Sequence, residues 1–322
     1  MKLVITIPAL NEEETILNTL EKIPGSFLGI DEITILVVDD GSTDNTANLA
    51  AKAGANVVSH IQNKGVGSAF QTAVSFALEH NADLLVNIDA DGQFDPNEIP
   101  LLITPVLDRK ADMVIGNRFH SGMPVDMPRV KFRGNKMVSR LVSAICGQSF
   151  TDVSCGFRSY NRESLYRLNI YGQFTYTHET ILSAVYQGLK VIEVPISVRY
   201  YPERRSRVAG SIPKYAIQTS KIIMRVLLDY RPLKVFGTTS IISIVIGLAF
   251  GIFLFIHYIL TRSFTPYKTF GFLALGFIIF GLIILFIALV SDMLNRMKRN
   301  QEKMLFELKK LRHERKNPKT SK

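Results

Sequence analysis

Short apolar runs alternate with amphipathic stretches along the first two thirds of the chain. The apolar runs predict β-strands at Leu3–Ile7, Ile33–Val38, Val57–Ile61, Leu84–Ile88 and Met113–Gly116. Helical spacing predicts helices near Glu12–Ile23, Asp44–Ala53, Gly67–His80 and Pro96–Leu107. Strands that alternate with helices are typical of a parallel sheet covered on both faces. We therefore predict that residues 1–202 form an α/β domain with a mostly parallel sheet.

Two later runs are long enough to cross a membrane. Neither Val235–Leu260 nor Phe270–Ser291 contains Lys, Arg, Asp or Glu, and a helix needs roughly 20 apolar residues to span a bilayer core. A buried core helix is the alternative, but two such runs in tandem with basic flanks favour a two-helix transmembrane hairpin at residues 234–292. The basic flanks are Arg231, Lys234, Arg296, Lys298, Arg299 and Lys303. By the positive-inside rule, the α/β domain and both termini face the cytoplasm, as in a multi-pass inner-membrane protein.

Charge is divided unevenly along the chain. Residues 1–202 carry 17 Lys/Arg and 22 Asp/Glu, whereas residues 203–322 carry 21 and 6. Basic residues that flank apolar spans favour an anionic membrane surface as the partner over nucleic acid. Residues 293–322 are accordingly predicted to be a basic cytoplasmic tail, and a solvated tail is preferred for its last ten residues. The two cysteines form no CxxC motif, which predicts neither a disulfide framework nor a zinc site.

Two amphipathic stripes are candidates for contact with the membrane surface. Residues 203–233 contain a basic loop and then apolar positions at helical spacing, namely Ile212, Tyr215, Ala216, Thr219, Ile222, Ile223, Val226 and Leu227. A second stripe comprises Val130, Met137, Val138, Leu141, Val142 and Ile145, with Arg133, Lys136 and Arg140 beside it. Such stripes suit a helix in the interface plane. Packing against the protein core remains the alternative for both.

Acidic and amide side chains follow three of the predicted strands. The strand ends read Pro8-Ala9-Leu10-Asn11-Glu12, Asp39-Asp40-Gly41-Ser42-Thr43-Asp44 and Asp89-Ala90-Asp91-Gly92-Gln93. Open α/β sheets bind ligands at the carboxyl ends of their strands, so these three segments are expected side by side. The two carboxylates of Asp89 and Asp91 are hard oxygen donors of the kind that a phosphate-bound divalent cation requires.

These three motifs, in this order, resemble glycosyltransferase family 2, and more narrowly its polyprenyl-phosphate branch, which includes dolichyl-phosphate mannose synthases. Supporting stretches are Gly116-Asn117-Arg118, Thr151-Asp152-Val153-Ser154-Cys155-Gly156-Phe157-Arg158 and the two apolar runs after Arg231-Pro232-Leu233. The resemblance covers nearly the whole chain. It implies a GT-A fold and the transfer of sugar from a nucleotide to a lipid phosphate.

Carried onto this sequence, the resemblance assigns a donor site. Asp40 would hydrogen-bond the base, and Asp89 would lie on the ribose or metal side. Asp91 with Gln93 would hold Mg²⁺ or Mn²⁺ on the diphosphate, with Asp89 as a further candidate ligand. The nucleotide sugar would be lined by Pro8, Ala9, Asn11, Glu12, Asp40, Asp89, Ala90 and Asp91. A basic loop that closes over the diphosphate in relatives would correspond here to Arg205 or Arg207, for which a tether at lipid headgroups is the alternative.

The acceptor implied by the resemblance is a phosphate monoester on a long isoprenoid. A monoester has a second pKa of about 6, so it needs orienting cations more than a strong base. Arg118 and Arg133 are the candidates, because a guanidinium fork matches phosphate. Arg129, Lys131 and Ser139 compete for this role. Glu179, at the start of a predicted helix, either touches the sugar or is an ordinary helix-start acid.

The expected reaction is an inverting transfer of one hexose to undecaprenyl or dolichyl phosphate at the cytoplasmic membrane face. Asp91 would support the leaving group through the metal. The sequence leaves the sugar open among glucose, mannose and N-acetylglucosamine, and relatives make a tetramer plausible. The rivals are a transferase that acts on another lipid such as diacylglycerol, a non-catalytic membrane scaffold, and a soluble nucleotidyltransferase.

Overall fold

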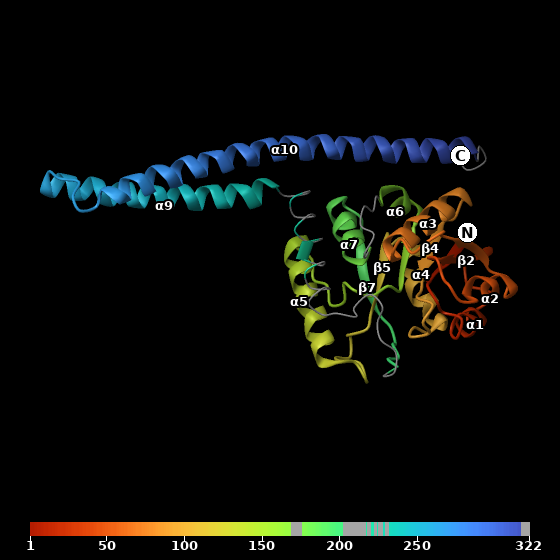
Figure 1. The fold of residues 1–322 in the computed structure, drawn as a ribbon. Coiled ribbons are helices and arrows are strands. Elements are labelled where there is room, and N and C mark those ends of the chain that lie inside the picture. The colour runs from red at the N-terminus through yellow and green to blue at the C-terminus, as the bar shows by residue number, and fades with distance from the viewer. Residues whose placement is uncertain are drawn as a thin grey trace. The chain divides into compact units, whose positions relative to one another are not determined.

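The structure, a computed structural model, describes residues 1–168, 176–201 and 232–316, with isolated helical positions at residues 217, 220, 221, 224 and 228 (Figure 1). Seven strands form one sheet in the order β3-β2-β1-β4-β6-β5-β7. Their bounds are β1 Lys2–Ala9, β2 Glu32–Asp39, β3 Asn56–Ser59, β4 Leu84–Asn87, β5 Met113–Asn117, β6 Arg158–Asn161 and β7 Val191–Pro195. All pairs are parallel except those that β6 makes with β4 and β5. The mostly parallel α/β sheet expected from the alternating pattern is confirmed.

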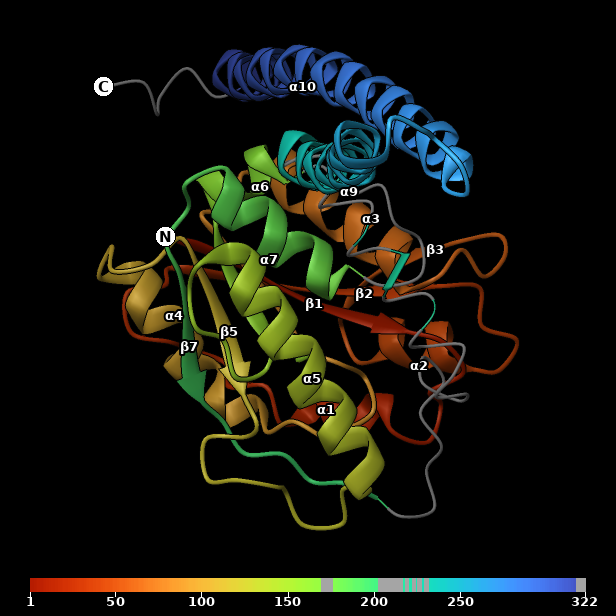
Figure 2. The same cartoon turned by 90° about the vertical axis from the view of Figure 1, so that its left-hand side faces the viewer.

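Helices cover both faces of this sheet (Figure 2). They are α1 Ile16–Glu21, α2 Thr46–Lys52, α3 Val66–Glu79, the 3₁₀ turn η1 Pro96–Glu98, α4 Ile99–Leu107, α5 Arg129–Cys146, α6 Arg162–Arg167 and α7 Thr177–Tyr186. Strand β6 shows how the layers are divided. Ser159 donates its hydroxyl to the Leu102 carbonyl of α4, whereas the next side chain, Tyr160, packs on Phe70 of α3. Because neighbouring strand residues point to opposite faces, α3 and α4 lie on opposite sides.

Strand β4 lies at the centre of the sheet. Leu84, Leu85 and Val86 are fully buried, which explains the continuous apolar run at this position: a strand covered on both faces has no solvent side. The following residues Ile88 and Ala90 are also buried. The segment that carries Asp89 and Asp91 is therefore anchored by its apolar neighbours.

Strands β6 and β7 and helix α6 were not predicted from the sequence, whereas α7 begins where a helix was expected at Glu179. Strand β6 reads Arg-Ser-Tyr-Asn, which lacks an apolar run, yet Arg158 is fully buried in it. The structure satisfies this guanidinium with the carbonyls of Val153, Cys155 and Thr177 and the hydroxyl of Thr180. A buried charge is tolerated only with such complete hydrogen bonding, and sequence patterning does not reveal it.

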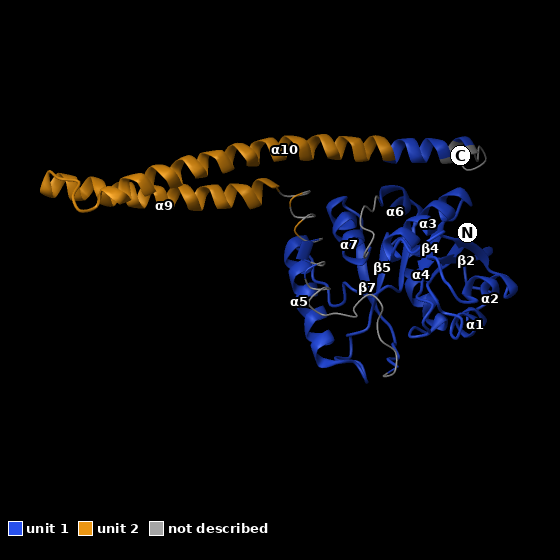
Figure 3. Ribbon diagram, viewed as in Figure 1, with its two compact units in different colours: residues 1–223, 306–322 blue, residues 224–305 orange. Residues whose placement is uncertain are grey.

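The chain divides into two compact units, which Figure 3 colours separately. One comprises residues 1–223 and 306–322, and the other residues 224–305. The second unit contains α9 Pro232–Thr261 and most of α10 Lys268–Lys316. Both helices are long and apolar enough to cross a membrane, and only 17% of each apolar window is buried.

Small residues bring α9 and α10 together in the second unit. A side chain added at Gly247 or Gly281 would meet the facing helix at less than 3.0 Å. Ser240 and Ser243 donate hydrogen bonds to the carbonyls of Gly281 and Phe277 at 2.8 Å. Small residues and hydroxyl hydrogen bonds are typical of helix pairs packed in lipid.

Candidate active site

The three motifs that follow β1, β2 and β4 meet at one edge of the sheet, as the sequence predicts, because these strands are neighbours in the order β2-β1-β4. Side chains tie the first two loops together. The Ser42 hydroxyl accepts from the Asn11 amide, and the Asn11 side chain accepts from the Thr43 amide, both at 2.8 Å. The Thr46 hydroxyl accepts from the Glu12 amide. Asn11 adopts a φ of 50°, a conformation that asparagine tolerates better than most residues.

Asp40 shapes the loop that precedes α3. It is 5% exposed, and its carboxylate accepts from the amides of Lys64 and Gly65 and contacts His60 Nδ1 at 2.7 Å. The same loop passes close to Gly41, where a Cβ would lie 2.7 Å from the Gln62 carbonyl carbon. Asp40 thus fixes residues 60–65 beside the end of β2.

Asp89 and Asp91 form a close carboxylate pair after β4. Burial, and then the neighbouring Asp91 charge, raise the pKa of Asp89 to about 7. Burial also raises the pKa of Asp91, against a hydrogen bond from the Gln93 amide and the charges of Lys131 and Arg118. Two half-buried like charges next to each other disfavour their ionised forms unless a cation lies beside them.

The donor set fits a hard divalent cation. Two carboxylates and the Gln93 amide are oxygen ligands, and such a set leaves positions for phosphate oxygens and water, as Mg²⁺ prefers. Within the described residues, no group of three or more His, Cys, Asp or Glu side chains is placed to hold a metal ion. The Asp89–Asp91 pair supplies two carboxylates, and Gln93, expected from the sequence as a further ligand, donates its backbone amide to Asp91 at 3.0 Å.

Gly156 lets the backbone approach the Asp89 carboxylate closely. A Cβ at this position would lie 2.9 Å from both Asp89 carboxylate oxygens. The Gly156 carbonyl is fixed in turn, because it accepts from Asn87 Nδ2 at 2.9 Å and from the Tyr176 hydroxyl. Asn87 and Tyr176 are both buried, so the segment has little room to retreat.

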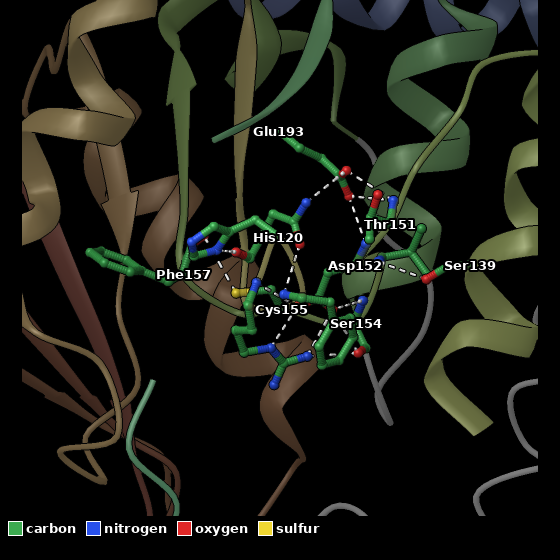
Figure 4. A network of polar contacts seen from close by, with 12 residues as sticks. His120, Ser139, Thr151, Asp152, Ser154, Cys155, Phe157 and Glu193 are labelled. Atoms are coloured by element: carbon green, nitrogen blue, oxygen red, sulfur yellow. Dashed lines mark hydrogen bonds and ion pairs between the residues drawn. The ribbon is translucent and has the colours of Figure 1, made fainter. Parts of the chain in front are cut away.

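The buried carboxylate of Asp152, which Figure 4 labels, holds the guanidinium of Arg118. Its Nε and Nη2 donate to the two oxygens of Asp152 at 2.6 and 2.8 Å, Nη2 donates to Ser154, and Nη1 donates to the Tyr200 hydroxyl at 3.3 Å. The Asp152 charge holds the pKa of Arg118 well above its usual value, against burial, while Arg118 keeps the pKa of Asp152 low despite burial. Glu193 accepts from the backbone amides of Thr151 and Asp152, which fixes the loop.

Lys131, in the first turn of α5, is the cation that the structure places beside this network. Its Nζ lies 5.2 Å from the ring centre of Tyr200. Burial and the Arg118 charge lower its pKa, whereas Asp91 and Asp152 raise it. Lys131 therefore lies within electrostatic reach of the carboxylate pair, as a half-buried ammonium group.

The other acceptor candidates lie elsewhere. Arg133 is exposed on α5. Ser139 is 2% exposed, and its hydroxyl accepts from the Val153 amide at 3.3 Å, so in this structure it anchors the loop instead of facing solvent. Glu179 lies in the first turn of α7 and is half-buried. Arg205 and Arg207 lie outside the described residues.

The chain returns to the carboxylate loop just before the basic segment. The Arg199 amide donates to the Gln93 carbonyl at 2.9 Å, and the Tyr201 hydroxyl donates to the Gly92 carbonyl at 3.4 Å. Tyr201 is the last described residue before Arg205 and Arg207.

Sequence reasoning gave no role to Gly156, Asp152 and Tyr200. The signal for the first two was present, since the stretch Thr151–Arg158 stood out as a motif, but a motif does not state which residue its loop approaches. Tyr200 and Lys131 come from segments far apart in sequence, and only the fold brings them together.

Comparisons with known proteins agree with this geometry. The family model described as Glycosyl transferase family 2 matches residues 4–168. An undecaprenyl-phosphate mannosyltransferase of Micrococcus luteus is 30% identical over 67% of this chain and 91% of its own length. A UDP-N-acetylglucosamine–dolichyl-phosphate N-acetylglucosaminyltransferase of Methanococcus voltae is 30% identical over 61% of this chain and 85% of its own.

The same fold occurs among solved structures. Glucosyl-3-phosphoglycerate synthase from Mycobacterium tuberculosis, crystallised with Mn²⁺, uridine diphosphate and glucosyl-3-phosphoglycerate, matches with a TM-score of 0.55 at 23% identity. The match covers 70% of this chain and 78% of that one. At this identity the likeness shows the fold, which confirms the expected GT-A architecture.

Proposed function

Because this chain belongs to glycosyl transferase family 2, in the branch that acts on polyprenyl phosphates, we propose that it transfers one hexose from a nucleotide diphosphate sugar to polyprenyl phosphate. The observation that carries the proposal is the pair of half-buried carboxylates, Asp89 and Asp91, with the half-buried cation Lys131 within electrostatic reach of Asp91. The first group suits a metal-bound diphosphate and the second suits an attacking phosphate.

The donor nucleotide is proposed to lie over the edge formed by β1 and β2. Pro8, Ala9, Asn11 and Glu12 border this edge, and Asp40 keeps the opposite loop in place through its contacts with Lys64, Gly65 and His60. Asp40 has both oxygens engaged in this structure, so any hydrogen bond that it accepts from the base would be shared with these groups. Ala90 is buried behind the diphosphate position.

The diphosphate is proposed to lie at Asp91, with Asp89 and Gln93 completing the protein ligands of Mg²⁺ or Mn²⁺. A divalent cation there would supply Lewis-acid stabilisation of the departing nucleoside diphosphate. The described residues fit this role, because the pKa of each carboxylate is raised by burial and each would gain from a cation. Arg205 and Arg207 follow Tyr201, which contacts the same loop, and we propose that they close over the donor.

The acceptor phosphate is proposed to bind Lys131, with the exposed Arg133 nearby on α5. Arg118, fully engaged by Asp152, Ser154 and Tyr200, is proposed to act by positioning these groups and by its long-range charge. The phosphate oxygen attacks the anomeric carbon, the bond to the nucleoside diphosphate breaks with its electron pair, and configuration inverts. No strong base is needed, since a phosphate monoester is largely dianionic near neutral pH.

Membrane attachment completes the proposal. Helices α9 and α10 are proposed to span the cytoplasmic membrane, with the catalytic part and both termini on the cytoplasmic side. Helix α5 adds an exposed apolar stripe of Val130, Met137 and Leu141, whereas Val138, Val142 and Ile145 of the same expected stripe belong to the core. The core interpretation thus holds for one face of this helix, and we propose that the other face contacts the membrane.

The full chain, purified in detergent with Mn²⁺ or Mg²⁺, tests the function. It is offered a panel of nucleotide sugars with either polyprenyl phosphate or diacylglycerol, and the lipid products are identified by mass spectrometry. We expect one donor to yield a polyprenyl-phosphate hexose. Product on diacylglycerol alone would support the rival lipid acceptor. Folded protein that forms no lipid-linked sugar from any donor would contradict the proposal.

Lys131→Met is expected to weaken the binding of polyprenyl phosphate more than the binding of the nucleotide sugar. A hydrogen bond to a charged group contributes about 1.5–3 kcal/mol, so the KM for polyprenyl phosphate should rise about tenfold or more, with a smaller change in the KM for the nucleotide sugar. Initial rates measured against each substrate separate these effects.

Lys136→Met is the matched control for Lys131→Met. Lys136 lies in the same helix, is exposed, and contacts the Phe132 ring, so its loss should leave both KM values near the wild-type level. Equal acceptor KM values in the two variants would contradict the role given to Lys131.

A further inference from the structure

Helix α10 extends well beyond its apolar span. It runs unbroken from Lys268 to Lys316, whereas the stretch without charged residues ends at Ser291. The remaining turns carry charges of both signs, so this part of the helix lies outside a bilayer core. It nevertheless keeps a continuous line of exposed apolar side chains.

These exposed side chains repeat at alternating intervals of three and four residues. Beyond the span they are Leu294, Met297, Met304, Leu308 and Leu311, each between 51% and 63% exposed, and Ile283, Ile287 and Val290 continue the spacing into the span. In heptad notation, Ile287, Leu294 and Leu308 occupy a positions and the others of this line d positions. The exposed Met293 and Leu305 flank the line at g and e positions. A spacing that averages 3.5 residues is the pattern of a left-handed coiled coil. Gln301 fills the one polar a position between Leu294 and Leu308.

The opposite side of the same helical segment already has a partner within the chain. Phe306 packs edge-on against Tyr166 and lies under the Arg167 guanidinium, 4.9 Å from the ring centre. Lys309 Nζ donates to the carbonyls of Tyr166 and Leu168 at the end of α6. These contacts lie in the first compact unit and use b and f positions, which leaves the a/d line exposed.

We infer that this a/d line of α10 is an interface for the same helix of a second copy of the chain, in a parallel coiled coil. Charge supports a second copy. In a parallel pair a g residue meets the e residue five positions later on the partner, which places Glu307 opposite Arg312 of the partner subunit, and both are exposed here. The parallel direction rests on the proposed membrane topology, since two copies inserted alike send their tails to the same side.

Disulfide cross-linking of the full chain tests this interface, in membranes and in a Cys146→Ser background. Facing a positions of a parallel pair lie next to each other, whereas c positions point apart. We expect Leu308→Cys to form a disulfide-linked dimer at least about tenfold faster than Lys310→Cys, the exposed c-position control. Adding Gln301→Leu should strengthen the dimer, because a polar a residue costs stability.

Two results would overturn the inference. One is equal cross-linking at positions 308 and 310. The other is no cross-link together with quenching of Leu308→Trp, the sole tryptophan, by brominated lipid, which would assign the line to the membrane surface. Transfer activity is measured separately on each variant, so a failed dimer and a failed transferase remain distinguishable.

Discussion

Asp91→Asn is expected to reduce sugar transfer at least about a hundredfold. The substitution keeps the size of the side chain but removes the charge that, in the proposed mechanism, holds the cation on the departing diphosphate. A metal ion contributes several kcal/mol of charge stabilisation in such reactions, and each 1.36 kcal/mol is tenfold in rate. The measurement is the initial rate of lipid-linked sugar formation at saturating Mn²⁺.

Asp95→Asn is the matched control for Asp91→Asn. Asp95 lies four residues away, is exposed, and caps the η1 turn by accepting from the Asn97 amide, which asparagine also does well. We expect Asp95→Asn to keep nearly full activity. Asp91→Asn with wild-type rates, or an equal loss in both variants, would remove the basis for a cation at Asp91 and would favour a non-catalytic scaffold.

Gly156→Ala is expected to cause the second largest loss of sugar-transfer activity. The added methyl group would lie 2.9 Å from both oxygens of Asp89, and the Gly156 carbonyl is pinned by Asn87 and Tyr176. The Asp89 carboxylate must therefore move, and a displacement of about 1 Å at an active site can cost about a hundredfold. We expect a lower kcat and a higher Mn²⁺ concentration for half-maximal activity.

Gly25→Ala provides the control, because a Cβ there meets nothing within 4 Å. Thermal unfolding of both variants shows whether the loss at Gly156 is local. If Gly156→Ala binds Mn²⁺ and turns over as the wild type does, the close approach of this loop to Asp89 has no functional consequence.

The catalytic edge could be predicted because its acidic and amide residues directly follow apolar runs that are typical of strands. Leu84–Ile88 is apolar except for the buried Asn87, since β4 is covered on both faces, and the carboxylates follow directly. The predicted adjacency of the three motifs is confirmed by the order β2-β1-β4. Helix α10 was predicted only as an apolar span with a basic tail, because the apolar a and d residues beyond Ser291 alternate with charged residues that dominate the composition.

The acceptor side could not be predicted in the same way. Lys131 and Arg133 lie two residues apart on α5 and so point to nearly opposite sides of the helix. Which of them faces Asp91 depends on how α5 packs, which the sequence does not state. The sequence suggested that the Arg118 guanidinium is available to bind a phosphate. In the structure it binds instead the carboxylate of Asp152, which lies 34 residues later in the chain. Strand β6 was not predicted because its first residue, Arg158, is a buried charge whose hydrogen-bond acceptors only the fold supplies.

Anomalous diffraction from crystals of the full chain, grown with Mn²⁺ and a nucleoside diphosphate, shows directly whether Asp91 binds the cation. We expect one manganese peak bound by the Asp91 carboxylate, with Asp89 and Gln93 beside it and the diphosphate oxygens completing the shell. An ordered nucleotide with manganese bound elsewhere, or an empty edge at saturating Mn²⁺ and nucleotide, would contradict it.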